Sequence, residues 1–153
     1  MEKTLVLLKP SALQRGIVGE VINRFEKKGL RFVGLKMIQL TDEILNVHYA
    51  HLREKPFFND LKRSMMSTPV IACCLEGIDA VAVVRALTGY TNGRKAIPGT
   101  IRGDYCMSNQ QNIVHASDSL EAAEVEIARF FKPEEIVEYD PSTMRYLYAI
   151  DEA

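Results

Sequence analysis

The sequence predicts a single mixed α/β domain, residues 1–153, in which helices pack against a four-stranded, mainly antiparallel sheet. Two observations support this fold class. Short apolar runs bounded by proline or glycine alternate with segments whose apolar residues recur at the helical period. In addition, 47% of the residues are hydrophobic and 25% are charged, which suits a soluble domain with an ordinary core.

The first half of the chain reads as strand, helix, strand. "KTLVLLK" (3–9) is short and almost wholly apolar, and a proline follows it, so it predicts a buried strand. "GIVGEVINRFEKKG" (16–29) places four apolar residues on one helical face, and its final glycine ends the helix. "LRFVGLKMIQL" (30–40) alternates roughly and predicts the second strand.

Two helices are expected to interrupt the strands next. Thr41 can cap a helix that runs to about Arg53, and a second short helix is expected around residues 57–66. "PVIACCLEG" (69–77) then predicts a strand, and "IDAVAVVRALTG" (78–89) predicts a helix.

The last apolar run, "NIVH", predicts the final strand. Asp118 or Ser119 can cap the helix that follows. The expected buried stripe of this helix consists of Leu120, Ala123, Ile127, Phe130 and Phe131. The predicted order is β-α-β-(α-α)-β-α-β-α. Without the inserted helical pair and the last helix it becomes βαββαβ, a ferredoxin-like sandwich with helices on one face of the sheet.

One long segment, residues 88–111, shows no convincing element. It holds four of the nine glycines and also carries Arg94, Lys95 and Arg102, with Arg85 just upstream. Glycines beside arginines and hydroxyls suit a phosphate site, because they allow close backbone approach and supply bidentate donors. Composition alone favours a solvated surface loop equally well.

The composition also excludes some classes of protein. The net charge is −1, from 19 basic and 20 acidic residues, so no bulk field favours nucleic acid or a membrane as partner. Cys73, Cys74 and Cys106 form no disulfide pattern and indicate buried thiols. No apolar run approaches the ~18 residues of a membrane span, and none resembles a signal peptide. We therefore expect a cytoplasmic protein.

Two histidines on a predicted helix raise the question of a metal site. His48 and His51 lie three residues apart and could share a metal ion. Because no third ligand is at hand, a role on the helix surface is the favoured interpretation.

A third histidine, in "NIVHASDS" (112–119), has a more specific setting. A lone histidine is more often structural than catalytic. His115, however, ends a strand just before a helix N-terminus, where free N–H groups attract anions. Ser117 and Asp118 lie within reach, and Glu126 sits beside the apolar stripe, so its carboxylate can point inward. A neutral imidazole held by hydrogen bonds is a competent nucleophile toward phosphorus.

The same stretch resembles the active-site signature of nucleoside diphosphate kinases, Asn-x-x-His-(Gly/Ala)-Ser-Asp. The resemblance covers essentially the whole chain and includes "HYAHLREKPFF", "TGYTN" and "PGTIRGDYC". It implies a ping-pong enzyme. A nucleoside triphosphate gives its γ-phosphoryl group to His115, and the phosphohistidine passes the group to a nucleoside diphosphate.

The resemblance also implies roles for further residues. Lys9 and Asn112 match positions near the ribose 3′-hydroxyl, with Lys9 also near the transferred phosphate, and Phe57 matches the aromatic residue on which the base stacks. The matched phosphate ligands are Arg85, Thr91 and Arg102. The matched residues that support the histidine are Tyr49, Ser117 and Glu126. Taken singly, Phe57 could belong to the core, Lys9 could be a strand-end charge and Arg85 could form a helix salt bridge.

The implied ligands are nucleoside triphosphates and diphosphates such as ATP and GTP. Mg²⁺ is expected to arrive with their phosphates rather than in a protein metal site. The length of the chain beyond Tyr139 resembles that of the hexameric members, so a homohexamer is expected.

The sequence departs from the family pattern at four positions. The family's tryptophan near the C-terminus is absent, with Tyr146 nearby instead. Ala116 stands where glycine is frequent, and Asn109 stands where an apolar residue is frequent. Gly93 replaces a common proline. If its loop keeps the family conformation, Gly93→Pro should stabilise the protein by ~0.4–1 kcal/mol. If the loop instead has a φ that only glycine tolerates, the same change should destabilise the protein.

Two other classes of function compete with a kinase. A non-enzymatic nucleotide-binding or scaffold protein of the same fold predicts loss of His115, Lys9 or the arginines, and all are present. A nucleic-acid-binding module on the same sheet topology predicts a basic surface, which the near-neutral charge argues against.

Overall fold

The computed structural model, which describes residues 1–152, contains a four-stranded antiparallel sheet in the order β2-β3-β1-β4. The strands are β1 (Glu2–Leu8), β2 (Arg31–Ile38), β3 (Val70–Gly77) and β4 (Val114–Ala116). The helices are α1 (Pro10–Gln14), α2 (Val18–Lys28), α3 (Asp42–His48), α4 (Phe58–Met65), α5 (Ala80–Thr88), α6 (Ile101–Tyr105) and α7 (Leu120–Phe130). Short 3₁₀ turns are η1 (Ala50–Leu52), η2 (Gly93–Lys95), η3 (Pro133–Glu135) and η4 (Met144–Tyr146). The predicted ferredoxin-like sandwich is confirmed.

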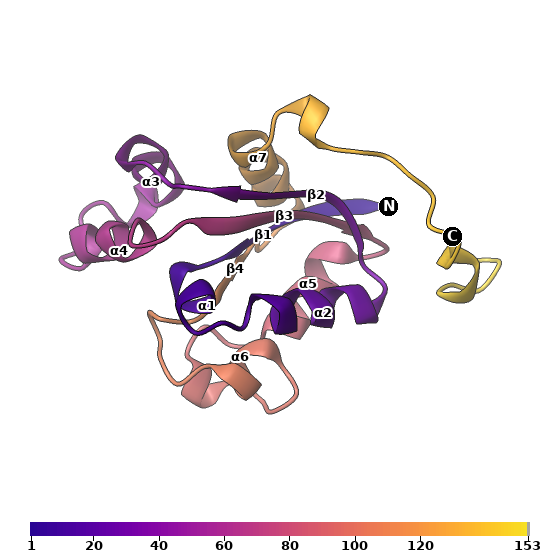
Figure 1. Cartoon of the computed structure of the whole chain (residues 1–153), viewed down its shortest axis with the longest axis horizontal. Coiled ribbons are helices and arrows are strands. Elements are labelled where there is room, and N and C mark those ends of the chain that lie inside the picture. Colours follow the sequence, from indigo (N-terminus) through magenta and orange to yellow (C-terminus); the bar gives the residue numbers. More distant parts are fainter. Residues whose placement is uncertain (153) are drawn as a thin grey trace.

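Helices cover both faces of the sheet (Figure 1). Along β1, Leu5 and Leu7 join a core cluster with residues of α3, α4 and α7, whereas Val6 and Leu8 join a second cluster with residues of α1, α2 and α5. Alternate side chains of a strand point to opposite faces. Because both faces of β1 are buried, its sequence is a continuous apolar run rather than an alternating one.

Local signals at the helix ends have the expected geometry. Gly29 ends α2 in the left-handed conformation, with φ of 100°. The Thr41 hydroxyl accepts a hydrogen bond from the Ile44 N–H at 3.4 Å, and the Ser119 hydroxyl accepts one from the Ala122 N–H at 3.1 Å. The helix that Thr41 caps ends at His48, earlier than expected.

The expectation of an unstructured segment at 88–111 is wrong, because it contains η2 and α6. Thr100 caps α6 by accepting a hydrogen bond from the Gly103 N–H at 2.9 Å. Asp104 accepts one from the Gly99 N–H at 2.8 Å and also pairs with Arg24 of α2. Elements of three to five residues are too short to show a helical period in the sequence, so they could not be predicted from it. In the structure these hydrogen bonds hold the segment in place.

Gly93 lies in a crowded part of this segment, and the expectation that proline would stabilise it is wrong on structural grounds. The Gly93 N–H donates to the Ser108 carbonyl at 3.1 Å, a bond that proline cannot make. A Cβ at Gly93 would lie 2.3 Å from the Cys106 carbonyl oxygen and 2.5 Å from its Sγ. The chain therefore approaches Cys106 more closely than any side chain at position 93 would permit.

We accordingly predict that Gly93→Pro destabilises the protein by roughly 1–3 kcal/mol, the usual cost of overpacking. Urea midpoints measured by activity and by size-exclusion chromatography check this. Gly93→Ala, which keeps the N–H, separates steric crowding from loss of the hydrogen bond. A midpoint for Gly93→Pro equal to or above that of the parent protein would contradict the prediction.

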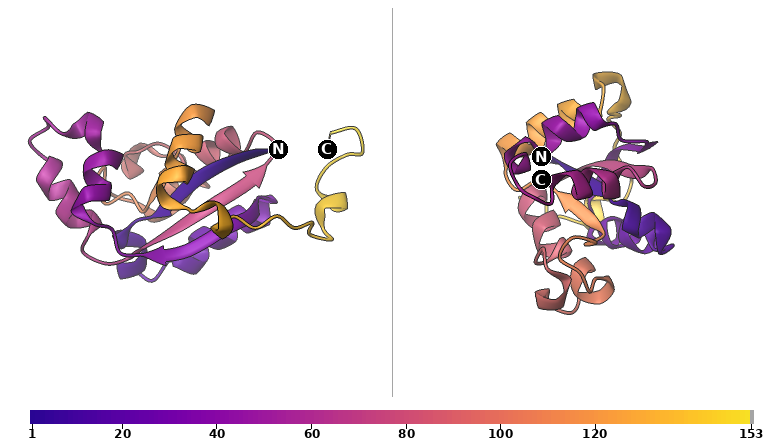
Figure 2. Two further views of the ribbon diagram at one scale, coloured as in Figure 1. Left: turned by 90° about the horizontal axis from the view of Figure 1, so that it is seen from above. Right: turned by 90° about the vertical axis from the view of Figure 1, so that its left-hand side faces the viewer.

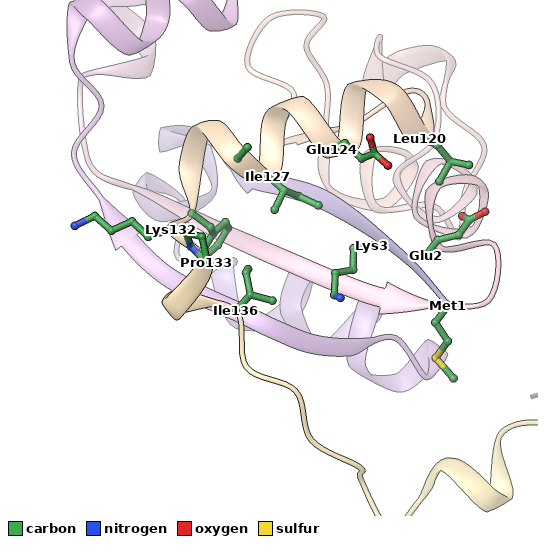
Figure 3. A pocket seen from close by; sticks show the side chains of 11 residues that line it. Met1, Glu2, Lys3, Leu120, Glu124, Ile127, Lys132, Pro133 and Ile136 are labelled. Carbon is green, nitrogen blue, oxygen red and sulfur yellow. The ribbon is translucent and has the colours of Figure 1, made fainter.

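The remaining surface has two notable features. After η3 the Val137 N–H donates to the Val33 carbonyl of β2 at 2.7 Å, and the chain then runs to η4 (Figure 2). Beyond η4 the Tyr148 hydroxyl accepts from the Ile78 N–H at 3.4 Å, just past the end of β3. A groove of about 590 Å³ lies between α7, the start of β1 and η3 (Figure 3); its lining includes Lys3, Leu120 and Ile127 but none of the predicted site residues. Leu120, expected in the buried stripe, is instead exposed beside this groove. Within residues 1–152, every helix is too short or too polar to cross a membrane.

Candidate active site

The strand register determines where His115 points. In the antiparallel ladder His115 pairs with Leu7, while Val114 pairs with Leu8 and Ala116 with Val6. Paired residues project from the same face, so His115 shares the face on which Leu7 meets α3, α4 and α7. Ala116 lies in this extended strand without a positive φ, so alanine in place of the family's frequent glycine strains nothing.

A carboxylate from α7 holds one nitrogen of His115. His115 Nε2 lies 2.8 Å from Glu126 Oε2, and the Ser117 hydroxyl donates to the same oxygen at 2.8 Å. Burial acts to raise the pKa of Glu126, but the hydrogen bonds and charge it receives from His115, together with Ser117, hold it below its usual value. Because an ionised carboxylate only accepts, neutral His115 carries its proton on Nε2 and keeps a lone pair on Nδ1.

A strained turn leads into β4. Ile113 has φ of 73°, a left-handed value that is unusual for a β-branched residue. The Val114 N–H donates to the Asn112 carbonyl at 2.8 Å, which closes a γ-turn, and the Lys9 N–H donates to the Ile113 carbonyl at 2.8 Å. Strain of this kind costs about 1–3 kcal/mol and persists only where surrounding contacts impose it.

Arg102 supplies several of those contacts. Its side chain is 3% exposed, and its three nitrogens donate to backbone carbonyls: Nε to Asn112 at 3.2 Å, Nη1 to Gly89 at 2.8 Å and Nη2 to Val114 at 2.5 Å. The guanidinium therefore fastens both sides of the turn before His115 to the end of α5. The family resemblance implies that Arg102 binds phosphate. In the fold it also holds the backbone of this turn in place.

Lys9 and Asn112 meet directly beside the same turn. Lys9 Nζ donates to Asn112 Oδ1 at 2.7 Å, and Asn112 Nδ2 donates to the Asn109 carbonyl at 2.9 Å and the Thr91 carbonyl at 3.4 Å. Asn112 thus links the end of β1 to the glycine-rich segment. Sequence positions more than 100 residues apart become neighbours here.

Three cations, Lys9, Arg85 and Arg102, lie close together, and none of them forms an ion pair with a carboxylate within residues 1–152. Burial, assisted by the charge of Arg102, lowers the pKa of Lys9 to about 8. Burial, assisted by the charge of Arg85, lowers the pKa of Arg102 to about 10. Mutual repulsion of this kind is relieved when an anion binds, so the cluster is electrostatically suited to a polyphosphate.

Arg85 and Thr91 line a separate surface hollow of about 360 Å³ with Gly89 and Thr100. Arg85 is exposed and forms no ion pair within residues 1–152, so the helix salt bridge considered from the sequence is not observed. Thr91 is also exposed, and its carbonyl joins it to Asn112.

Phe57 stands apart from the other predicted site residues. It is 37% exposed just before α4, whereas the adjacent Phe58 is buried in the core. The alternative that Phe57 belongs to the core is therefore wrong. Within residues 1–152 no ring contact joins Phe57 to His115, and its exposed ring is available to a ligand.

His48 is a neighbour of His115 that the sequence did not reveal. The expectation that His48 lies on the helix surface is wrong: it is buried, and its ring lies edge-on to His115 with centroids 4.7 Å apart. Tyr49 also packs edge-on against His48, with ring centroids 4.7 Å apart, and its buried hydroxyl has no hydrogen-bond partner within residues 1–152. Burial, followed by the charge of Glu126, raises the pKa of Tyr49. The spacing of His48 from buried Leu45 was the available signal.

Comparison with known proteins identifies the family. Residues 2–136 match the family model for nucleoside diphosphate kinase. The chain belongs to the nucleoside diphosphate kinase family. It is 64% identical to a nucleoside diphosphate kinase from Parabacteroides distasonis, with 99% of each chain covered, and 46% identical to human nucleoside diphosphate kinase A, with 96% of this chain and 97% of that one covered.

Solved structures of the family have the same fold. The nucleoside diphosphate kinase of Halobacterium salinarum, solved in complex with CDP, superposes with a TM-score of 0.94 at 42% identity, covering 97% of this chain and 99% of that chain. A family protein from Babesia bovis superposes with a TM-score of 0.93 at 39% identity, covering 97% of this chain and 100% of that one. Membership makes this kinase a phosphotransferase of a nucleotide-binding family, whose standard mechanism is ping-pong.

Proposed function

We propose that the kinase transfers the γ-phosphoryl group of a nucleoside triphosphate to a nucleoside diphosphate through Nδ1 of His115. The lone pair on Nδ1 attacks phosphorus, the bond to the bridging oxygen breaks, and the nucleoside diphosphate leaves with those electrons. The second half-reaction runs in reverse with another diphosphate. The proposed functional unit is the whole chain, residues 1–153.

One observation carries this proposal. His115 presents a free nitrogen because Glu126 holds the other one at 2.8 Å, beside a group of cations that form no ion pair among the described residues. The nucleophile needs no proton removed. When the N–P bond forms, the ring keeps its Nε2 proton and gains positive charge, which the Glu126 carboxylate stabilises.

We assign the cations to the phosphates and Phe57 to the base. Lys9, Arg85 and Arg102 would balance the charge on the transferring group and the leaving diphosphate, and Thr91 would donate to a phosphate oxygen. Asn112, held by Lys9 at 2.7 Å, would contact the ribose 3′-hydroxyl region. Tyr49 and Ser117 would support His115.

The family uses a divalent cation, and we propose Mg²⁺ bound to the nucleotide phosphates. The donor set agrees with this choice. Mg²⁺ prefers oxygen ligands, and two of the three groups in the clustered ligand set His48, His115 and Glu126 are imidazoles. Oxygen ligands would therefore come from the phosphates and water. When bound, the ion would neutralise phosphate charge.

Labelling with γ-³²P ATP tests the proposal. Protein incubated with the nucleotide and freed from it should retain label that is lost in acid and survives alkali, as expected for phosphate on nitrogen. Addition of unlabelled GDP or CDP should then move the label into the corresponding triphosphate. Acid-stable label, or label that no diphosphate removes, would rule the mechanism out.

The role of Phe57 predicts an effect on binding rather than on chemistry. Stacking is worth ~1–3 kcal/mol and acts alike in ground and transition states, so Phe57→Ala should raise KM roughly 5- to 100-fold with little change in kcat. Phe57→Tyr keeps a ring and should restore KM. Steady-state kinetics check both variants, and a large fall in kcat for Phe57→Ala would show that the residue acts elsewhere.

The lowered pKa of Lys9 predicts a pH dependence. Its ammonium group is charged below about pH 8 and neutral above it. Because kcat/KM reports the free enzyme, kcat/KM should fall as pH rises through about 8, as the attraction for phosphates is lost. Lys9→Arg stays charged, so the alkaline fall in its normalised profile should shift upward. If kcat/KM of Lys9→Arg fell at the same pH as that of the parent protein, the titrating group would be one other than Lys9.

We further propose a cytoplasmic homohexamer. The outer edge of β2 has no neighbouring strand within residues 1–152, although the Val137 N–H donates to the Val33 carbonyl at 2.7 Å, and its Leu35 and Met37 are 55% and 64% exposed. A strand edge without a partner strand and with exposed apolar side chains favours association with another copy. Light scattering after size-exclusion chromatography measures the mass directly, and Leu35→Glu should reduce it. A monomeric mass for the unmodified protein would exclude the hexamer.

A further inference from the structure

His48 has a setting that its position at the end of α3 does not explain. It is 6% exposed, and its ring meets three others edge-on: His115 and Tyr49 at 4.7 Å and Phe130 at 5.2 Å between centroids. The planes of His48 and His115 are inclined by 81°. A polar ring has therefore been placed against the phosphoryl-accepting histidine, where an aliphatic side chain would fill the core at a lower desolvation cost.

The protonation state of His48 follows from its partner. Arg129 Nη1 lies 3.0 Å from His48 Nδ1, and arginine can only donate, so Nδ1 holds a lone pair and the proton resides on Nε2. Nε2 is buried and has no partner within residues 1–152. Burial, followed by the charge of His115, lowers the pKa of His48 to about 3. His48 is thus neutral, in one tautomer, and tied to α7.

The same bond argues against a metal site. Ligand atoms of His48, His115 and Glu126 lie within 4.8 Å of one another, close enough to suggest a transition-metal centre. To bind a cation, Nε2 of His48 would have to move its proton to Nδ1, where it would face the N–H of Arg129. The charges of Arg129 and Lys9, which already disfavour protonated His48, would also repel a cation. The cluster therefore fits a packing and hydrogen-bonding role.

We propose that His48 is a positioning residue for His115, an inference that rests on the proposed phosphoryl transfer. Rotation of an imidazole about its last torsion is only weakly restricted, and the single hydrogen bond that His115 donates to Glu126 still lets the ring turn about that bond. The edge-on contact with His48 blocks this rotation of the His115 ring. Nε2 of His115 therefore stays hydrogen-bonded to Glu126, and its Nδ1 stays directed toward the nucleotide. Arg129 in turn holds His48. Because Glu126 and Arg129 both lie on α7, about one turn apart, this one helix orients both histidines, and we call the arrangement of His48 against His115 the clamp.

The test compares His48→Ala with Leu45→Ala. Leu45 is also fully buried on α3 but makes no ring contact with His115, so it reports destabilisation alone. His48→Ala should lower kcat roughly 10- to 100-fold with KM nearly unchanged, the cost of a misplaced nucleophile. His48→Phe keeps a ring edge and should recover much of kcat. Equal losses in the two alanine variants, or no recovery in His48→Phe, would overturn the proposal.

Nitrogen NMR of His115 separates this inference from the proposed function. Without nucleotide, neutral His115 should be a single tautomer with a slowly exchanging Nε2 proton in the parent protein and in Leu45→Ala. In His48→Ala a second tautomer and faster exchange should appear. An unchanged spectrum in His48→Ala rejects the clamp even if labelling succeeds. A changed spectrum with no labelling of the parent protein would retain the clamp and reject phosphoryl transfer.

Discussion

His115→Ala is expected to take up no label from γ-³²P ATP and to show no measurable turnover between nucleoside triphosphates and diphosphates. The physical reason is that the neighbouring imidazole, His48, cannot take over: it is buried, and its Nδ1 lone pair accepts the hydrogen bond from Arg129. The Glu126 carboxylate would lose the partner it holds at 2.8 Å, but Ser117 still donates to it. Folding and nucleotide binding should therefore survive.

His51→Ala is the matched control, because His51 is an exposed histidine in η1, just after the end of α3. It should label and turn over like the parent protein. Circular dichroism and nucleotide binding by calorimetry establish that His115→Ala is folded. Acid-labile label on the folded His115→Ala protein would show that another histidine carries the phosphoryl group.

Arg102→Ala is expected to lower kcat by roughly 10²–10³, the scale observed when one preorganised transition-state donor is removed. It should also lower stability. Three backbone carbonyls, at Gly89, Asn112 and Val114, lose their donor at once. One hydrogen bond to a charged group is worth about 1.5–3 kcal/mol, so a loss of at least that size is expected in urea unfolding.

Arg85→Ala separates the two tasks of Arg102. Arg85 is exposed and makes no ion pair within the described residues, so its removal should weaken phosphate binding with little effect on stability. Arg102→Lys keeps the charge but not the three-way fork, and should be intermediate in both measurements. If Arg102→Ala were as stable as the parent protein and within tenfold of its kcat, both roles would be wrong.

Much of the fold was predictable because its signals are local. The left-handed Gly29, the Thr41 and Ser119 caps and the apolar runs of β1 and β3 act within a few residues of themselves. The inward orientation of Glu126 could also be expected, since its position beside the apolar stripe of α7 directs it toward Ser117. The short α1 and α6 were missed because five residues are too few to establish a period.

The candidate site divides in the same way. By its resemblance to a family, the sequence alone singled out His115, the cations and the exposed aromatic as the candidate site residues. Only the tertiary structure decided that His48 meets His115, that Arg102 fastens the strained turn at Ile113, and that Gly93 lies against Cys106. Periodicity tells which face of a helix is buried but not which residue it meets there. Those meetings depend on strand register and on packing between segments distant in sequence, such as β1 with β4 and α3 with α7.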